Sequence, residues 1–236
     1  MNRRGFTLIE LMIVIAIIAV IAAIAIPGLL SSQRASNERN AATSLKTLTS
    51  AEADFRANDR DGNKVNDFWT ANVSGLYTMT SAAVSGNSNG TMDPAIKLIE
   101  LSIASADADS TPVAAGGENA VLTQFSVSAS KAGYWYQALI SDNGVAGPES
   151  TYRQDTNGAL AMGSVHNYWK FGFTAWPETR SAGKFVFVID ENNTIFRSAI
   201  SSNVSPSNLT PPGPATAPYD TYPSPDDLKS FWSKLD

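Results

Sequence analysis

The residues from Arg3 to Leu30 constrain this chain more than any other stretch. After Gly5 they read FTLIELMIVIAIIAVIAAIAIPGLL, which is apolar apart from Thr7, Gly28 and one carboxylate, Glu10. As a helix this run is long enough to cross a bilayer, which takes roughly 20 residues. An acid inside such a run is costly to bury, so Glu10 is by default a functional-site candidate.

Three general interpretations of this N-terminus are weak. A secretory signal has a shorter apolar region followed by a small-residue cleavage site, whereas this run continues past its alanines to Leu30. A twin-arginine signal is suggested only by the adjacent Arg3 and Arg4. A plain membrane anchor would explain neither Glu10 nor the glycine that precedes the apolar run. The basic residues ahead of the span keep that end cytoplasmic, so the remainder of the chain is expected to be exported.

The sequence R-R-G-F-T-L-I-E resembles the cleavage and methylation signal of type IV prepilins and of type II secretion pseudopilins. The resemblance covers about the first 55 residues. It implies that prepilin peptidase cuts after Gly5 and methylates the new N-terminus at Phe6. It also implies a structural protein, not an enzyme, which starts as a single-pass inner-membrane protein and ends in a periplasmic or extracellular filament.

The same resemblance implies a set of partners. These are further copies of the chain in a helical filament, minor pilins or pseudopilins, prepilin peptidase and the inner-membrane assembly platform. In a stack of such helices, the cationic N-terminus of Phe6 can pair with Glu10 of a neighbouring copy, and a low dielectric strengthens that attraction. Pro27 and Gly28 would let the helix bend during packing.

Two functions remain open at this stage. The first is a filament subunit, in either a type IV pilus or the pseudopilus of a protein secretion system. The second is a membrane-anchored extracytoplasmic binding module that does not polymerise. The absence of cysteine excludes the disulfide that closes a C-terminal loop in many pilins, and this favours the pseudopilin.

Hydrophobic periodicity predicts one helix from about residue 6 to residue 57. Its second half carries an apolar stripe at a spacing of three to four residues, with Lys46, Thr47, Ser50 and Glu52 expected elsewhere on the helix. The stripe consists of Ala41, Leu45, Leu48, Ala51 and Phe55. Such a stripe needs a partner surface, which the rest of the chain must supply.

Alternation with a period of two predicts strands in the second half of the chain. The expected strands begin near Phe125, Tyr134, Tyr168, Lys184 and Thr194. The fold class is therefore α+β, with a long N-terminal helix packed against a C-terminal antiparallel sheet, as in pilins. We expect a leader at residues 1–5, a transmembrane and polymerisation helix at 6–30, a globular domain at 31–204 and a proline-rich tail with a short terminal helix at 205–236.

The aromatic residues of this half are expected in the core and in cross-strand pairs rather than as platforms for sugars. The set comprises Trp69, Tyr134, Trp135, Tyr136, Tyr168, Trp169 and Trp176. In the connecting region, Asp93-Pro94 predicts a short helix with Ile96, Ile99 and Ile103 on its buried face. At the C-terminus, Ser224-Pro225 predicts a helix that places Leu228, Phe231, Trp232 and Leu235 on one face.

A candidate calcium loop follows the long helix. Its ligands would be Asp59, Asp61, Asn63, Val65 and Asp67, at alternate positions that match part of a calcium-binding loop. The match is incomplete, because Lys64 replaces the usual glycine and Thr70 the usual glutamate. An Asx-rich turn that ends the helix explains the same residues.

Composition excludes several other functions. The formal net charge is −5, and removal of Arg3 and Arg4 with the leader takes it to −7, so no basic surface for nucleic acid is indicated. His166 is the only histidine, which argues against a histidine-based metal site or catalytic triad and favours a surface or strand-end position. No catalytic constellation is recognisable, and calcium is the only cofactor that the sequence suggests.

Overall fold

The computed structural model describes residues 7–60, 65–78, 96–108, 128–154, 165–200 and 220–235. Several sequence predictions fall outside these ranges. They concern the cleavage site at Gly5 and Phe6, the loop positions Asp61 and Asn63, and the strand that begins at Phe125.

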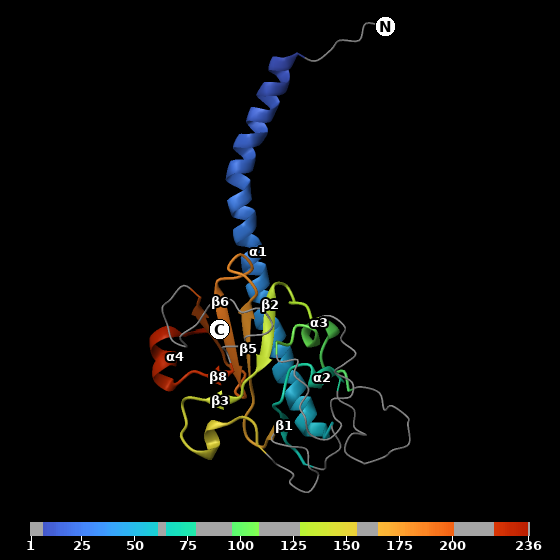
Figure 1. The fold of residues 1–236 in the computed structure, drawn as a ribbon, viewed down its shortest axis with the longest axis vertical. Helices are drawn as coiled ribbons and strands as arrows, with labels where there is room; N and C mark the ends of the chain where they lie inside the picture. The colour runs from blue at the N-terminus through green and yellow to red at the C-terminus, as the bar shows by residue number, and fades with distance from the viewer. Residues whose placement is uncertain are drawn as a thin grey trace.

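Helix α1 (Leu8–Asn58) dominates the fold and confirms the predicted long helix. Its first half projects from the domain and its second half lies against the sheet (Figure 1). Thr7 caps the N-terminus, and the chain leaves the helix at Asp59, whose φ of 44° places it in the left-handed region. The helix passes through Pro27 without interruption and curves gently (Figure 1).

The predicted apolar stripe of α1 is confirmed. All five of its residues, from Ala41 to Phe55, are at most 4% exposed. Glu52 was expected elsewhere on the helix, but it is also fully buried. Its position four residues after Leu48 and three before Phe55 puts it on the same face, so helical geometry prevailed over its charge.

The main sheet is antiparallel and has five strands in the order β2-β5-β6-β7-β9. Its strands are β2 (Tyr134–Ala138), β5 (Gly172–Pro177), β6 (Phe185–Asp190), β7 (Ile195–Ala199) and β9 (Ser233–Leu235). One face packs on α1 through alternate residues such as Tyr136, Phe173 and Phe187. The other face carries Trp135, Trp176 and Val186, which pack with Trp232. The described residues thus confirm the predicted α+β fold.

Two short strand pairs lie at the end of the sheet away from the apolar half of α1 (Figure 1). The pair β1 (Phe68–Trp69) and β4 (His166–Asn167) is antiparallel, and the pair β3 (Ser141–Asp142) and β8 (Thr221–Tyr222) is parallel. Helices α2 (Gly75–Thr78) and α3 (Leu101–Ala104) lie beside α1, and the 3₁₀ turn η3 (Pro148–Ser150) follows β3. The short helix α4 (Pro225–Phe231) precedes β9.

Four local predictions were wrong. The strand expected from Tyr168 begins only at Gly172, because the preceding residues form a turn. The helix expected from Asp93 is not helical between residues 96 and 100, and α3 starts at Leu101. Residues 205–225, rich in proline and serine, were expected to form neither strand nor helix, but Thr221 and Tyr222 form β8.

The C-terminal helix is also shorter than predicted. Ser224 caps it as expected, since its Oγ accepts a hydrogen bond from the amide of Asp227 at 3.2 Å. It ends at Phe231, however, and no residue of α4 is buried. Ser233–Leu235 instead form β9, which pairs with β7 and satisfies backbone groups that an edge strand would leave open.

Candidate functional site

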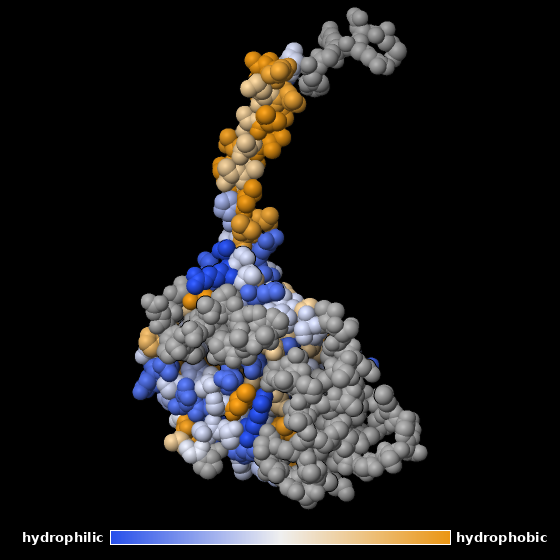
Figure 2. Space-filling model, in the orientation of Figure 1, coloured by the Kyte–Doolittle hydropathy of each residue, from blue (hydrophilic) through white to orange (hydrophobic). Residues whose placement is uncertain are grey.

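The apolar half of α1 is the most unusual surface of the molecule. From Leu8 to Leu30 nearly every side chain is exposed, including Ile24 at 76%. Figure 2 shows this half as a continuous hydrophobic rod above a domain whose visible surface is more polar. By length and composition it is the one candidate membrane span among the described residues. Exposed apolar surface of this extent indicates burial in lipid or against other proteins.

Glu10 lies at the start of this rod and closes a capping box with Thr7. Its Oε2 accepts hydrogen bonds from the Thr7 amide and the Thr7 hydroxyl, each at 2.8 Å. The Glu10 amide donates in return to the Thr7 hydroxyl at 3.3 Å. In the isolated subunit the carboxylate therefore satisfies the N-terminus of its own helix.

Pro27 and Gly28 lie within the continuous helix at the lower end of the rod. A β-carbon built on Gly28 would meet no atom within 4 Å, so packing within the subunit does not require glycine there. The Gly28 carbonyl accepts hydrogen bonds from the hydroxyls of Ser31 and Ser32, at 2.8 and 3.0 Å. Hydroxyls that bond back in this way are often associated with helix bending.

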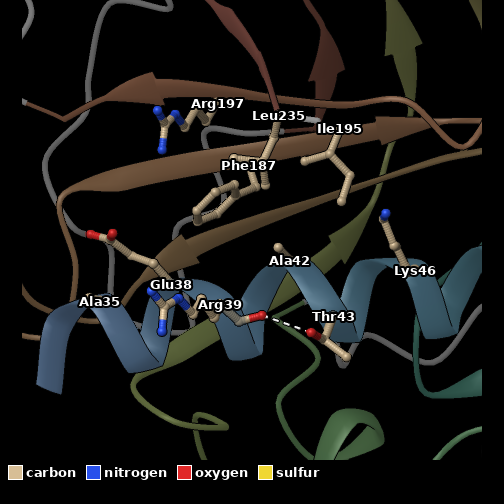
Figure 3. A pocket seen from close by; sticks show the side chains of 10 residues that line it. All are labelled: Ala35, Glu38, Arg39, Ala42, Thr43, Lys46, Phe187, Ile195, Arg197 and Leu235. Atoms are coloured by element: carbon tan, nitrogen blue, oxygen red, sulfur yellow. Dashed lines mark hydrogen bonds between the residues drawn. The ribbon is translucent and has the colours of Figure 1, made fainter. Parts of the chain in front are cut away.

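A groove of about 570 Å³ runs between α1 and strands β6, β7 and β9. Phe187 and Ile195 extend from the sheet toward Ala42 on the helix, and Arg39 and Arg197 lie along the groove (Figure 3). The Arg197 guanidinium also lies 4.7 Å from the centre of the Phe185 ring. Apolar residues with arginine at the margin are typical of protein contact surfaces.

The candidate calcium loop is described only in part. Asp59 caps α1, and Asp67 is fully buried just before β1. Within the described ranges, no three Asp, Glu or His side chains are grouped so as to hold a metal ion. Asp67 lies instead beside a second buried carboxyl, that of Glu52.

Glu52 is the buried acid that the sequence did not predict. Its Oε2 accepts a hydrogen bond from the Trp69 amide at 3.0 Å, while Oε1 is buried without a hydrogen-bond partner. Burial raises the pKa of Glu52 well above 4.5, and the neighbouring charge of Asp67 raises it further, whereas the Trp69 amide lowers it. The spacing of Glu52, four residues after Leu48 and three before Phe55, is the feature of the sequence that could have predicted its burial.

The aromatic set divides into two groups. Five of the seven are buried, as predicted; these are Trp69, Tyr134, Trp135, Tyr136 and Trp176. Tyr168 and Trp169 are exposed, at 38% and 78%. His166 is in a strand but not at the surface, since it is 1% exposed and its ring packs edge-on against Trp69, with 5.4 Å between ring centres.

Trp169 stands beside a cleft of about 680 Å³ at one end of the sheet. The cleft lies where β5 begins and β6 ends, next to β3 and η3. The opposite end of these strands is the β5–β6 turn, where Arg34 and Asn37 of α1 bind the carbonyls of Ser181 and Ala182. The cleft therefore lies at the end of the domain away from the apolar rod.

Comparisons with known proteins match the N-terminal region. The family described as the prokaryotic N-terminal methylation motif matches residues 1–26. The type IV major pilin protein PilA of Myxococcus xanthus is 46% identical over 54 residues, which are 23% of this chain and 24% of that protein. The chain thus spans about a quarter of the length of the curated relative that it matches. No solved structure matches the chain.

These matches confirm the resemblance to type IV pilins that the first residues predicted. The family concerns an N-terminal methylation motif, and the relative is a major pilin. The family match ends at residue 26 and the relative matches only 54 residues, so most of the chain, including most of the sheet and the cleft beside Trp169, lies outside the matches. The roles of those surfaces must therefore be argued from their own geometry.

Proposed function

We propose that this chain is a pilin-like subunit that is inserted in the inner membrane, processed, and polymerised into a filament through its N-terminal helix. The observation that carries the proposal is the exposed apolar rod of α1, Leu8 to Leu30, joined to a helix half that its own sheet covers. A rod of this kind can be buried first by lipid and then by the same rod of neighbouring copies.

The proposed processing follows from the N-terminal match. Prepilin peptidase would cut after Gly5 and methylate Phe6, and the assembly platform would then extract the subunit. The type IV pilus is the favoured filament, because the curated relative is a major pilin of that system. A pseudopilus of type II secretion is the second candidate, favoured by the absence of cysteine.

The proposed register of the filament depends on Glu10. Its capping box with Thr7 uses Oε2 for both hydrogen bonds that it accepts. The cationic N-terminus of a neighbouring Phe6 would compete for or share this carboxylate when the rods pack. An unpaired carboxylate among apolar helices is costly, so one axial register is favoured over the others.

Two features would assist the packing of copies. Pro27 and Gly28 would act as a hinge, because the proline lacks an amide donor and the space beside the Gly28 α-carbon is open. The groove beside α1, with Ala42 and Phe187 in its floor and Arg39 and Arg197 at its rim, offers a surface for a neighbouring domain.

Calcium remains a proposal for the loop between α1 and β1. Asp59, Asp61, Asn63, Val65 and Asp67 would supply oxygen ligands, of the kind that calcium prefers. The fully buried Asp67 beside Glu52 supports it, since a cation would compensate two neighbouring carboxyls.

The decisive experiment is electron microscopy of material sheared from cells, with N-terminal sequencing of the subunit. Filaments that contain the chain and begin at methylated Phe6 are expected. A chain that is cleaved yet never recovered in filaments, and stays in the inner-membrane fraction, would instead favour an anchored binding module. A chain that keeps Met1 to Gly5 would contradict the processing step.

A further inference from the structure

The exposed Trp169 is held by an unusually firm turn. Asn167, fully buried in β4, accepts hydrogen bonds at its Oδ1 from the amides of Trp169 and Lys170, at 2.8 and 3.0 Å. Its Nδ2 donates to the carbonyl of Tyr152 at 3.1 Å. A buried amide with this network fixes the turn, so the indole is presented in a defined position rather than on a free loop.

Lys170, the next residue, is also held in place. Its Nζ forms an ion pair with Asp142 at 3.2 Å, donates to the carbonyl of Glu149, and lies 4.8 Å from the centre of the Tyr152 ring. Asp142 in turn accepts the amide of Gly144 at 2.8 Å. The polar groups around the indole are therefore ordered by the fold before any ligand arrives.

The cleft beside Trp169 combines an aromatic face with polar groups. Its walls include the carboxyls of Glu149 and Glu191 and the amide of Gln154, and Val145 is the one aliphatic side chain among the described lining residues. The centre of a protein contact is usually apolar and poor in charge, which this cleft is not. A ligand that fits it has an apolar face for the indole and many hydroxyl groups for the amide and carboxylates.

A pyranose ring has this chemistry, with C–H bonds on one face and hydroxyls around its edge. The balance of charge selects among sugars. Asp142, Glu149 and Glu191 bring three carboxyls to the cleft, and Lys170 is the one cation among the described residues that line it. Acidic sugars would be repelled by this excess of negative charge. Partial burial raises the pKa of Glu191, which moderates that charge without reversing it.

We propose that Trp169 and the adjoining cleft bind a pyranose unit of a neutral polysaccharide, with the indole stacked on the sugar and the Gln154 amide and the carboxylates of Glu149 and Glu191 bound to its hydroxyls. The site faces away from the apolar rod, so it stays accessible while α1 is buried in a membrane or among other helices. The proposal does not depend on filament formation.

The test is isothermal titration calorimetry on the purified full-length chain. The detergent should be zwitterionic, because a detergent with a sugar head group would compete for the site. The probes are neutral oligosaccharides of glucose, mannose, galactose and N-acetylglucosamine, with an oligogalacturonate as the acidic counterpart. Binding of at least one neutral oligosaccharide is expected, and the oligogalacturonate should bind more weakly or not at all.

The variants separate stacking from general surface effects. Trp169→Ala should weaken the binding by about tenfold, equivalent to roughly 1.4 kcal/mol, as expected for loss of an aromatic platform. Trp169→Tyr should keep most of it. Phe231→Ala removes another exposed aromatic, 49% exposed on α4, and should leave it unchanged.

Three results would overturn the proposal. They are no binding by any neutral oligosaccharide, equal binding by Trp169→Ala, and preferential binding of the acidic probe. If no sugar binds and Trp169→Ala instead reduces association between copies of the chain, the exposed indole belongs to a subunit contact. The test is independent of filament formation, since calorimetry reports on the subunit whether or not it polymerises.

Discussion

Replacement of Glu52 by glutamine should stabilise the domain relative to the wild type, by an amount that grows as the pH rises. The wild-type carboxyl is fully buried, with Oε1 lacking a hydrogen-bond partner and Asp67 nearby. Burial, with a smaller contribution from Asp67, raises its pKa well above the ordinary 4.5. Glutamine has nearly the same shape and keeps an oxygen that can accept the Trp69 amide, but it never ionises.

The sign and size follow from proton linkage. The folded state binds the Glu52 proton more tightly than the unfolded state does, so this group's contribution to stability is fully present below the unfolded pKa. It is lost as the pH rises through the folded pKa. Within that window the wild type should lose up to about 1.4 kcal/mol of unfolding free energy per pH unit relative to Glu52→Gln.

The assay is urea unfolding of the full-length chain in detergent, followed by tryptophan fluorescence between pH 4 and pH 8. A chelator should be present throughout, so that no bound cation shifts the titration. Glu178→Gln, which removes an exposed carboxyl, is the matched control for the loss of one negative charge. A difference between Glu52→Gln and wild type that stays constant across this pH range would refute the reasoning.

Three further predictions test the two halves of α1 and the loop after it. Leu45→Ala should lower the unfolding free energy of the domain by about 2–5 kcal/mol, because Leu45 is fully buried. Ile17→Ala, at a residue that is 55% exposed, should leave this free energy unchanged and weaken only association, so urea unfolding and filament yield distinguish the two variants. Glu10→Gln should reduce filament yield without altering domain unfolding, and unchanged yield would contradict the pairing with Phe6. A chelator should lower the melting temperature if calcium is bound between Asp59 and Asp67, and Asp67→Asn should abolish that shift; an identical melting curve with and without chelator would count against the metal.

The long helix and the central strands were predictable because their side-chain periods are regular. The stripe from Ala41 to Phe55 repeats at helical spacing, and β6 and β7 alternate around a short turn. These patterns depend only on which face is buried, and that preference is strong wherever apolar residues recur. The N-terminal match adds the predicted role of the apolar rod, which periodicity alone cannot supply.

The features that were missed depend on tertiary contacts. Glu52 lies on the buried stripe by spacing, whereas it was expected elsewhere on the helix. Tyr168 and Trp169 were assigned to a strand because they precede an aromatic alternation, whereas the buried Asn167 organises a turn there. The final residues continued a helical pattern, but the open edge of β7 drew Ser233–Leu235 into a strand. A partner distant in the sequence decided the outcome for Glu52 and for Ser233–Leu235, and the turn at Trp169 depends on the nearby Asn167, which is itself bound to the carbonyl of Tyr152.

The placement of polar and apolar groups along α1 separates stability of the subunit from its association. Leu45, Leu48 and Phe55 bury their side chains within the chain, so the core of the domain is packed without residues of the rod. The rod from Leu8 to Leu30 makes no such contacts, so its apolar surface contributes free energy only when a lipid or another molecule covers it. Transfer of the rod from lipid to contacts with neighbouring helices would then leave the domain core unchanged. That is the property a subunit needs if it folds once and afterwards exchanges its membrane for a filament.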